Sequence, residues 1–184
     1  MKKSVIIGVA FAVCVALYLF YQIDLQPGGI SKDLRTYQSE VYGFSFSYPD
    51  AYTLSEQEVG TGERSHYSVV LTQTRDLPPP ENGEGPPTIS VDVYQNNIDW
   101  LSLIDWLTRT NFSNFKLSNG TYASTSVSGV EAVRYRWSGL YEGYTVAFSH
   151  RDSIVAVSGT YLTPSDAIVE DFESVLSSIR FLGR

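Results

Sequence analysis

Aromatic and small residues alternate along the stretch VYGFSFSYPDAY, residues 41–52. Four rings occupy every second position of it: Tyr42, Phe44, Phe46 and Tyr48. Because successive side chains of a strand point to opposite faces, the pattern predicts one strand with all four rings on the same face. A row of rings can also stack on bases or sugars. Since aromatic residues commonly fill the buried face of a sheet, we interpret this stretch as a core strand.

The same period of two recurs in several later segments. Residues 66–74 and 88–95 alternate, and the second of them places Ile89, Val91 and Val93 on its buried side. Four more strand patterns follow: residues 120–129, 130–139, 142–150 and 153–161. In the second of these, Val133, Tyr135 and Trp137 oppose Arg134 and Arg136. Short turn segments containing glycine or Arg-Asp separate the four, which predicts an antiparallel meander.

Two segments have the period of an amphipathic helix. In residues 99–110 the apolar positions are spaced i, i+3, i+4 and i+7, and Trp106 lies beside this stripe. The stripe consists of Trp100, Leu103, Ile104 and Leu107. Asp99 stands at the position of a helix N-cap. We therefore expect a helix that begins after Asp99.

The second helical segment ends the chain and opens with Thr163-Pro164-Ser165-Asp166, which has the spacing of a capping box. We expect its buried side to consist of Ile168, Phe172, Val175, Leu176 and Ile179, and its exposed side to carry Glu170, Asp171 and Glu173. An antiparallel sheet flanked by two amphipathic helices defines an α+β domain.

The order of these elements resembles a known family. A strand YGFSFSYP, two further strands, a helix with tryptophan, an antiparallel meander and a terminal FESVLSSIRF helix together resemble the PsbP-like family over residues 40–181. This resemblance implies an α/β/α sandwich that serves as a scaffold subunit or regulator, in some bacterial relatives on a membrane tether. It carries over no functional residue.

The first 21 residues form a separate unit. Lys2 and Lys3 precede 18 uncharged residues, Ser4–Tyr21, which as a helix of ~1.5 Å per residue span roughly the hydrocarbon core of a bilayer. The two lysines favour a cytoplasmic amino terminus. We therefore expect a signal anchor at residues 1–21 and a cell-membrane, single-pass protein whose carboxyl-terminal domain is extracytoplasmic.

A cleaved signal peptide is the alternative to this anchor, but its small-x-small pattern occurs only at residues 10–12, inside the apolar run. Lipid attachment at Cys14 is a further alternative, although bulky Val13 precedes that cysteine. Residues 22–39 contain Pro27-Gly28-Gly29 and lack clear periodicity, which predicts a flexible tether. The globular domain is then expected over residues 40–184.

Net charge argues against one class of partner. The chain has 13 basic and 20 acidic side chains, a formal charge of −7. Without Lys2 and Lys3 the balance is 11 against 20, or −9. A surface this acidic repels phosphate backbones, so we expect no nucleic-acid partner.

No motif of known chemistry stands out. His150-Arg151-Asp152 has the letters of a kinase catalytic loop, but Val157 stands where that loop needs asparagine. His66 and His150 lie on separate strand patterns without zinc-ligand spacing. Nucleophile elbows, phosphate loops and dinucleotide fingerprints do not occur, and we expect no cofactor. The sequons at Asn111 and Asn119 stay uninterpreted.

The loop Arg75–Pro87 is the least strand-like part of the domain, and its oxygen donors lack the regular alternation of a calcium loop. It can be a plain hairpin connection, yet long loops are also where partners bind. We take Pro78, Glu81, Asn82 and Glu84 as the candidate contact residues. The sequence favours a non-enzymatic domain that binds or scaffolds another envelope protein. The alternative is a cell-surface hydrolase of unrecognised type, for which a polar pocket at His66 or His150 would be the sign.

Overall fold

The computed structural model of the chain describes residues 33–60, 66–96 and 99–183. The predicted membrane anchor at residues 1–21 and most of the predicted tether lie outside the described residues. In the part that is described, no helix combines the length and the hydropathy needed to cross a bilayer.

Two antiparallel sheets contain the described strands. The smaller sheet has the order β1-β2-β10 and the larger the order β3-β4-β5-β9-β8-β7-β6. The strands of the smaller sheet are β1 (Leu34–Ser39), β2 (Phe44–Pro49) and β10 (Arg180–Phe181). The larger sheet consists of β3 (Tyr52–Val59), β4 (His66–Gln73), β5 (Thr88–Gln95), β6 (Ala123–Val127), β7 (Val130–Ser138), β8 (Glu142–His150) and β9 (Ser153–Tyr161). The meander predicted for the second half of the chain, β6 to β9, is confirmed.

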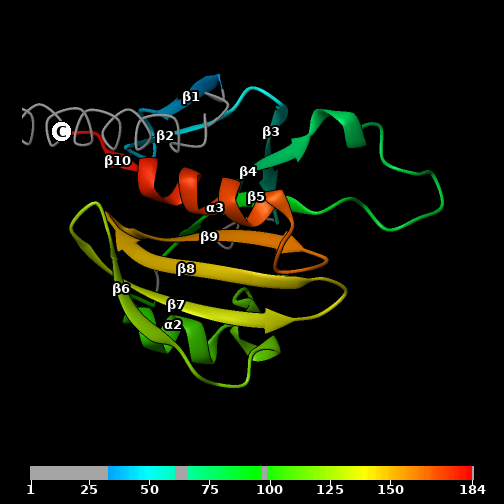
Figure 1. Cartoon of the computed structure of the whole chain (residues 1–184). Coiled ribbons are helices and arrows are strands. Elements are labelled where there is room, and N and C mark those ends of the chain that lie inside the picture. Colours follow the sequence, from blue (N-terminus) through cyan, green and yellow to red (C-terminus); the bar gives the residue numbers. More distant parts are fainter. Residues whose placement is uncertain (1–32, 61–65, 97–98, 184) are drawn as a thin grey trace, which may run out of the picture. The chain divides into compact units, whose positions relative to one another are not determined.

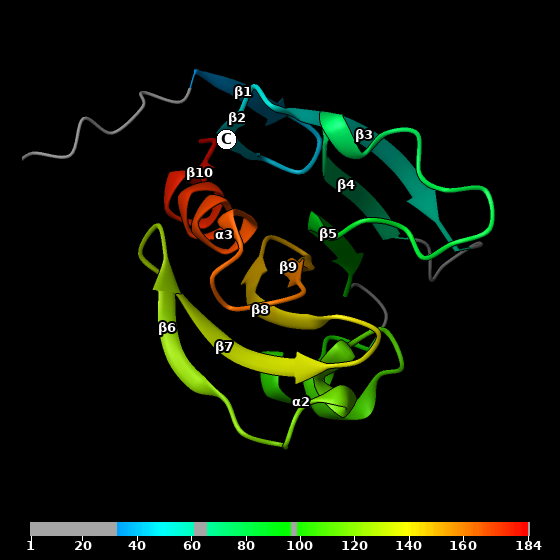
Figure 2. The ribbon, with the colours of Figure 1, turned by 45° about the vertical axis from the view of Figure 1, so that its right-hand side comes forward.

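Helices cover both faces of the larger sheet. The helix α3 (Ala167–Ser178) lies on one face and also packs against β2 of the smaller sheet, as Figures 1 and 2 show. The helix α2 (Leu103–Arg109) and the short 3-10 helix η3 (Asn114–Leu117) cover the opposite face. The expected α+β class, with one sheet between helices, is confirmed.

The aromatic strand is a core strand. In β2, the side chains of Phe44, Phe46 and Tyr48 are buried, with Phe46 only 1% exposed. Tyr42 precedes the strand and is partly buried, stacked on Tyr67 with ring centroids 4.6 Å apart. The rings therefore face the hydrophobic core, which excludes them as an open stacking platform.

The domain begins earlier than the sequence pattern indicated. Residues 34–39, which we expected to belong to the flexible tether, form β1 and pair with β2 along its whole length. Tyr37 of this strand is 8% exposed, and its ring lies 5.0 Å from that of Phe46. Tyr37 is the only buried residue of β1, and its neighbours in the sequence are polar. The segment therefore shows no alternation of apolar and polar residues from which a strand could be predicted. Pairing with β2 orders it nevertheless.

The helix α3 packs closely on both sheets. Phe172 lies against Gly159 of β9, where an added Cβ would come within 2.8 Å of the Phe172 ring. On the other side, the Ser178 hydroxyl accepts a hydrogen bond of 2.8 Å from the backbone N–H of Ser47 in β2. Because the helix lies between two sheets, more than one stripe of it is buried.

This position corrects the expected exposure of Asp171. Its side chain is 5% exposed instead of facing water, and it accepts a hydrogen bond of 2.9 Å from the hydroxyl of Tyr52. Burial raises the pKa of Tyr52, and the nearby Asp171 carboxylate raises it further. The phenol therefore stays protonated and can satisfy the buried carboxylate.

The expected start of α3 was also wrong. The helix begins at Ala167, with Asp166 at the N-cap position, and not immediately after Thr163. The Asp166 carboxylate points backwards and accepts hydrogen bonds from the backbone N–H groups of Leu162 and Thr163, both of 2.9 Å. The residues predicted as a capping box thus form a tight turn before the helix.

The helix α2 is shorter than predicted. Trp100 has a φ of +46°, in the left-handed region, which a continuous helix cannot contain. Ser102, and not Asp99, caps the helix by accepting from the backbone N–H of Asp105. Trp106 is consequently buried with Leu107, whereas Trp100 is 65% and Ile104 37% exposed.

We expect Phe46→Ala to destabilise the domain by about 3–5 kcal/mol, because the ring is fully buried and its loss leaves a cavity. Chemical denaturation of the domain measures this value. Ser45→Ala, on the other face of the same strand, is the matched control and should change stability by less than ~0.5 kcal/mol. Equal stability of Phe46→Ala and wild type would contradict the core position of the ring.

We also expect a fragment that begins at Glu40 to be less stable than one that begins at Asp33. The shorter fragment lacks β1 and the buried Tyr37, so the difference should reach at least ~3 kcal/mol, the cost of deleting a large buried ring. Thermal melting of the two fragments tests this. Identical melting temperatures would show that β1 adds nothing to the fold.

Candidate functional site

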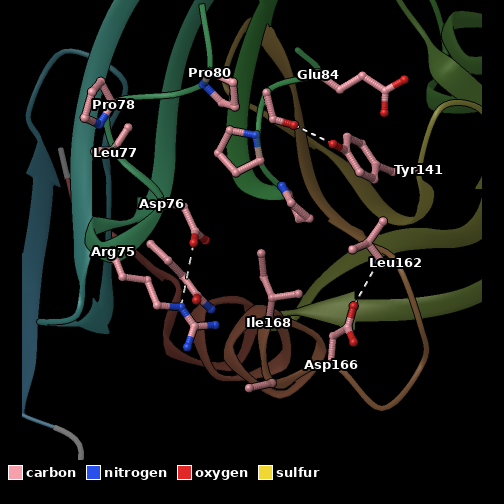
Figure 3. Close-up of a pocket in the computed structure, with 15 residues that line it drawn as sticks. Arg75, Asp76, Leu77, Pro78, Pro80, Glu84, Tyr141, Leu162, Asp166 and Ile168 are labelled. Carbon is pink, nitrogen blue, oxygen red and sulfur yellow. Dashed lines mark hydrogen bonds and ion pairs between the residues drawn. The ribbon is translucent and has the colours of Figure 1, made fainter.

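The loop between β4 and β5 forms one wall of a cleft of about 670 Å³ (Figure 3). It starts with the 3-10 helix η2 (Thr74–Asp76) and continues through a cis Leu77–Pro78 peptide bond. The opposite wall comes from the turn between β7 and β8 and from the segment that enters α3. The residues that line the cleft are Gln73, Arg75, Asp76, Leu77, Pro78, Pro80, Glu84, Gly85, Pro86, Pro87, Tyr141, Leu162, Asp166, Ala167 and Ile168.

Contacts with other parts of the domain hold the loop in this position. The Tyr141 hydroxyl donates a hydrogen bond to the Gly85 carbonyl, which ties the far end of the loop to the β7–β8 turn. At its near end, the backbone N–H of Thr74 donates to the Ala51 carbonyl over 2.8 Å. Proline restricts the backbone between these two points. The loop is therefore folded back on the domain as a wall.

The entry to α3 contributes a negative charge to the cleft. The hydroxyl and backbone N–H of Thr163, together with the backbone N–H of Leu162, donate to the Asp166 carboxylate and hold its pKa below the usual range. These hydrogen bonds thus favour the ionised form of Asp166. Leu162 itself is 66% exposed at the rim.

The structure divides the four candidate contact residues into two pairs. Pro78 and Glu84 line the cleft, whereas Glu81 and Asn82 are exposed at the outer part of the loop and do not line it. Sequence reasoning missed the opposite wall, Tyr141, Leu162 and Ile168. Its visible signal in the sequence was a large side chain in each of two short connections, Tyr141 between β7 and β8 and Leu162 between β9 and α3. That these come together depends on the folding of the sheet.

The lining of the cleft combines apolar side chains with carboxylates. It includes no histidine, cysteine, serine or lysine. The described residues also contain no group of histidine, cysteine or carboxylate side chains suited to a metal ion. Proline, leucine and isoleucine provide apolar contacts, and Asp76, Glu84 and Asp166 add negative charge. The cleft suits an apolar segment that carries a positive charge.

His66 does not form a catalytic relay with its neighbours. Its Nε2 lies 3.6 Å from one oxygen of Asp92, and the Ser90 hydroxyl donates to the other oxygen over 2.8 Å. In a serine hydrolase the histidine lies between serine and carboxylate, because it must take the serine proton. Here the carboxylate lies in the middle, so this arrangement does not activate Ser90.

His150 makes structural contacts. Its Nε2 donates to the Gly43 carbonyl over 3.1 Å, and its ring stacks on Phe181 of β10 with centroids 4.4 Å apart. Burial lowers the pKa of His150, and the adjacent Arg151 guanidinium lowers it further. The neutral ring therefore links β8 to the smaller sheet.

This lowered pKa predicts a pH dependence of stability. Unfolded histidine titrates near ~6.5, so between that pH and the lower folded pKa the unfolded chain binds more protons. Stability should fall as the pH falls through this window. Melting temperatures between about pH 7.5 and about pH 5 should therefore decrease less in His150→Gln than in wild type, since glutamine keeps a donor for Gly43 and does not titrate. Ser149→Ala, at the exposed neighbour, should keep the wild-type dependence, and equal slopes for all three would contradict the prediction.

Comparison with known proteins identifies the fold. No family model matches the sequence, and no curated protein matches it. Among solved structures, the solution structure of cyanobacterial PsbP (CyanoP) from Synechocystis sp. PCC 6803 matches with a TM-score of 0.55 and 15% sequence identity. The match covers 84% of this chain and 95% of that chain. The described domain therefore has the PsbP-like fold.

Proposed function

We propose that this protein is a non-enzymatic, membrane-anchored domain of the cell envelope, and that it binds a neighbouring envelope protein through the cleft between the 75–87 loop and the start of α3. One observation carries the proposal: the loop folds back to form a cleft with apolar walls, and it is held there by the Tyr141–Gly85 hydrogen bond. A loop that only connected two strands would need no second wall.

The size of the cleft indicates the kind of occupant. Its volume of about 670 Å³ lies within the ~300–1,000 Å³ of pockets that enclose a ligand of a few side chains. A short extended segment of a partner protein fits such a volume. Because the cleft is open at its rim, the remainder of the partner protein can stay outside it.

Charge defines the partner further. The chain carries a formal net charge of −7, and Asp76, Glu84 and Asp166 lie in the cleft itself, where Arg75 pairs with Asp76 over 3.8 Å. A partner segment with lysine or arginine beside apolar residues is complementary, and the field of the domain would speed its approach. The membrane anchor at residues 1–21 and the extracytoplasmic location of the domain stay predictions from the sequence.

We expect Leu162→Asp to reduce partner binding by at least ~10-fold, since a buried leucine contributes about 1.5–3 kcal/mol to an apolar contact. The measurement is recovery of crosslinked partners in a pulldown of the full chain from the cells that produce it. Leu140→Asp is the matched control, because both leucines are 66% exposed and only Leu162 lines the cleft. The free energies of unfolding of both variants should lie within ~0.5 kcal/mol of the wild-type value.

Replacing residues 79–84 by Asn-Gly should have the same effect on recovery as Leu162→Asp. It should cost little stability, because loop closure changes by only ~0.6 kcal/mol per doubling of length. If Leu162→Asp and the shortened loop recover as much crosslinked partner as wild type does, the cleft is excluded as the contact surface. Loss of recovery with Leu140→Asp alone would move the contact surface to the β7–β8 turn.

A further inference from the structure

The two faces of the larger sheet differ in polarity where β5 and β9 pair. Toward α3, β5 presents Ile89, Val91 and Val93, all 2% exposed or less. Toward the side of α2, the same strand presents Ser90, Asp92 and Tyr94, which all line a second pocket. Antiparallel register puts Ser158 and Thr160 of β9 on this side too. Polar side chains on a half-covered inner face are unusual and suggest a role beyond packing.

This second pocket has a volume of about 260 Å³ and is distinct from the cleft. Its lining residues come from the sheet and from the segment that contains α2 and η3. This segment covers the face of the sheet opposite α3 (Figure 2). Aromatic side chains form much of its lining: Tyr94, Trp106, Phe112, Tyr135 and Trp137. Its volume is below the ~300 Å³ at which pockets for larger ligands begin, so a small molecule or a single chemical group is the fitting occupant.

Most of the neutral polar groups around the pocket are hydrogen-bonded to one another. Asn114 accepts from the Tyr135 hydroxyl and donates to Thr145 over 3.1 Å. The Thr145 hydroxyl also accepts from Trp137 Nε1 over 2.9 Å and lies 2.8 Å from the Ser158 hydroxyl. A sugar or another polyol needs several free donors and acceptors, and this network leaves few.

Thr160 is committed in the same way. Its hydroxyl accepts from the backbone N–H of Thr88 over 2.8 Å and donates to the carbonyl of that residue over 3.2 Å. The neutral side of the pocket is thus a fixed wall. It offers shape to a ligand and little hydrogen bonding.

Asp92 is the exception among these polar groups. Its side chain is 16% exposed, and among the described residues it is contacted by the Ser90 hydroxyl and by His66. The His66 nitrogen is 3.6 Å away, longer than the ~3.2 Å limit of a good hydrogen bond. Two carboxylate oxygens can accept about four hydrogen bonds. A carboxylate largely removed from water gains stability from further hydrogen bonds or from a positively charged partner, and the pocket leaves room for a cation beside Asp92.

The rings are placed to hold the rest of such a partner. Tyr94 stacks on His66 with ring centroids 4.4 Å apart. It also packs against Trp106, with centroids 4.9 Å apart, and against Phe112, with centroids 5.9 Å apart. Trp137 lies directly over the backbone of Gly143, where an added Cβ would be 2.4 Å from its ring. Burial raises the pKa of Tyr94, with a further increase from the negative charge of Asp92, so this ring stays a neutral phenol. Ring faces attract cations, and aromatic cages bind methylated ammonium groups.

From a single under-coordinated carboxylate beside a wall of aromatic rings, the geometry points to a binding site for a small organic ammonium ion of the choline type. Asp92 is the counter-ion, and Tyr94, Trp106 and Trp137 provide ring contacts to the methyl groups. This site is independent of the proposed contact with an envelope protein.

Isothermal titration of the full chain in a non-ionic polyoxyethylene detergent tests the proposal, with choline as the probe. We expect choline to bind, and its neutral isostere 3,3-dimethylbutan-1-ol to bind at least ~10-fold more weakly, because the neutral molecule lacks the charge attraction to Asp92 and to the ring faces. Asp92→Asn should weaken choline binding at least ~10-fold, since it removes the charge and keeps the shape. Asp152→Asn, at an exposed carboxylate outside the pocket, should bind as wild type does.

A second variant guards against misfolding. Trp137→Leu should weaken choline binding, and Trp137→Phe should restore part of it; melting temperatures without ligand show that each variant is folded. Absence of choline binding by wild type, equal binding of the neutral isostere, or unchanged binding by Asp92→Asn would each overturn the proposal. Glucose binding more tightly than choline would overturn it as well and would show a polyol site.

Discussion

The packing of α3 between the two sheets is the constraint on which the rest of the domain depends. Gly159 has no side chain, so Phe172 approaches the backbone of β9 directly. On the opposite side of the helix, Ser178 bonds to Ser47 of β2. Any larger residue at Gly159 would push the helix away from the larger sheet. The smaller sheet would then lose its support.

Polar contacts orient the helix that this packing holds. The Asp171 carboxylate accepts from Tyr52 of β3, and Arg134 of β7 donates to Glu173 over 3.0 Å while its guanidinium lies 4.9 Å over the Tyr144 ring. Both pairs are at least partly buried, where a missing partner is costly. They fix the rotation of α3 about its axis. Its first turn is thereby brought to the loop between β4 and β5, and the cleft results.

The unequal cover of the larger sheet accounts for the second pocket. The twelve-residue α3 covers a mostly apolar region, whereas α2 has only seven residues and covers Ile154, Ala156 and Val133. Beside the shorter helix, β5 carries Ser90, Asp92 and Tyr94, and β9 carries Ser158 and Thr160. A short helix on a broad sheet face thus leaves a space that core packing does not fill.

Local periodicity by itself determined most strands, the existence of both helices and the α+β class, since a buried face leaves a period of two or 3.6 in the sequence. Phe46 and Val91 are clear from this pattern. Tyr37, Asp171 and the left-handed Trp100 are not, because pairing with β2, burial between two sheets and a positive φ are set by contacts distant in sequence. The loop with Pro78 and Glu84 was visible as a candidate contact. Tyr141 and Leu162 became its opposite wall only through tertiary packing, because residues so far along the chain from the loop cannot show this arrangement in their own spacing.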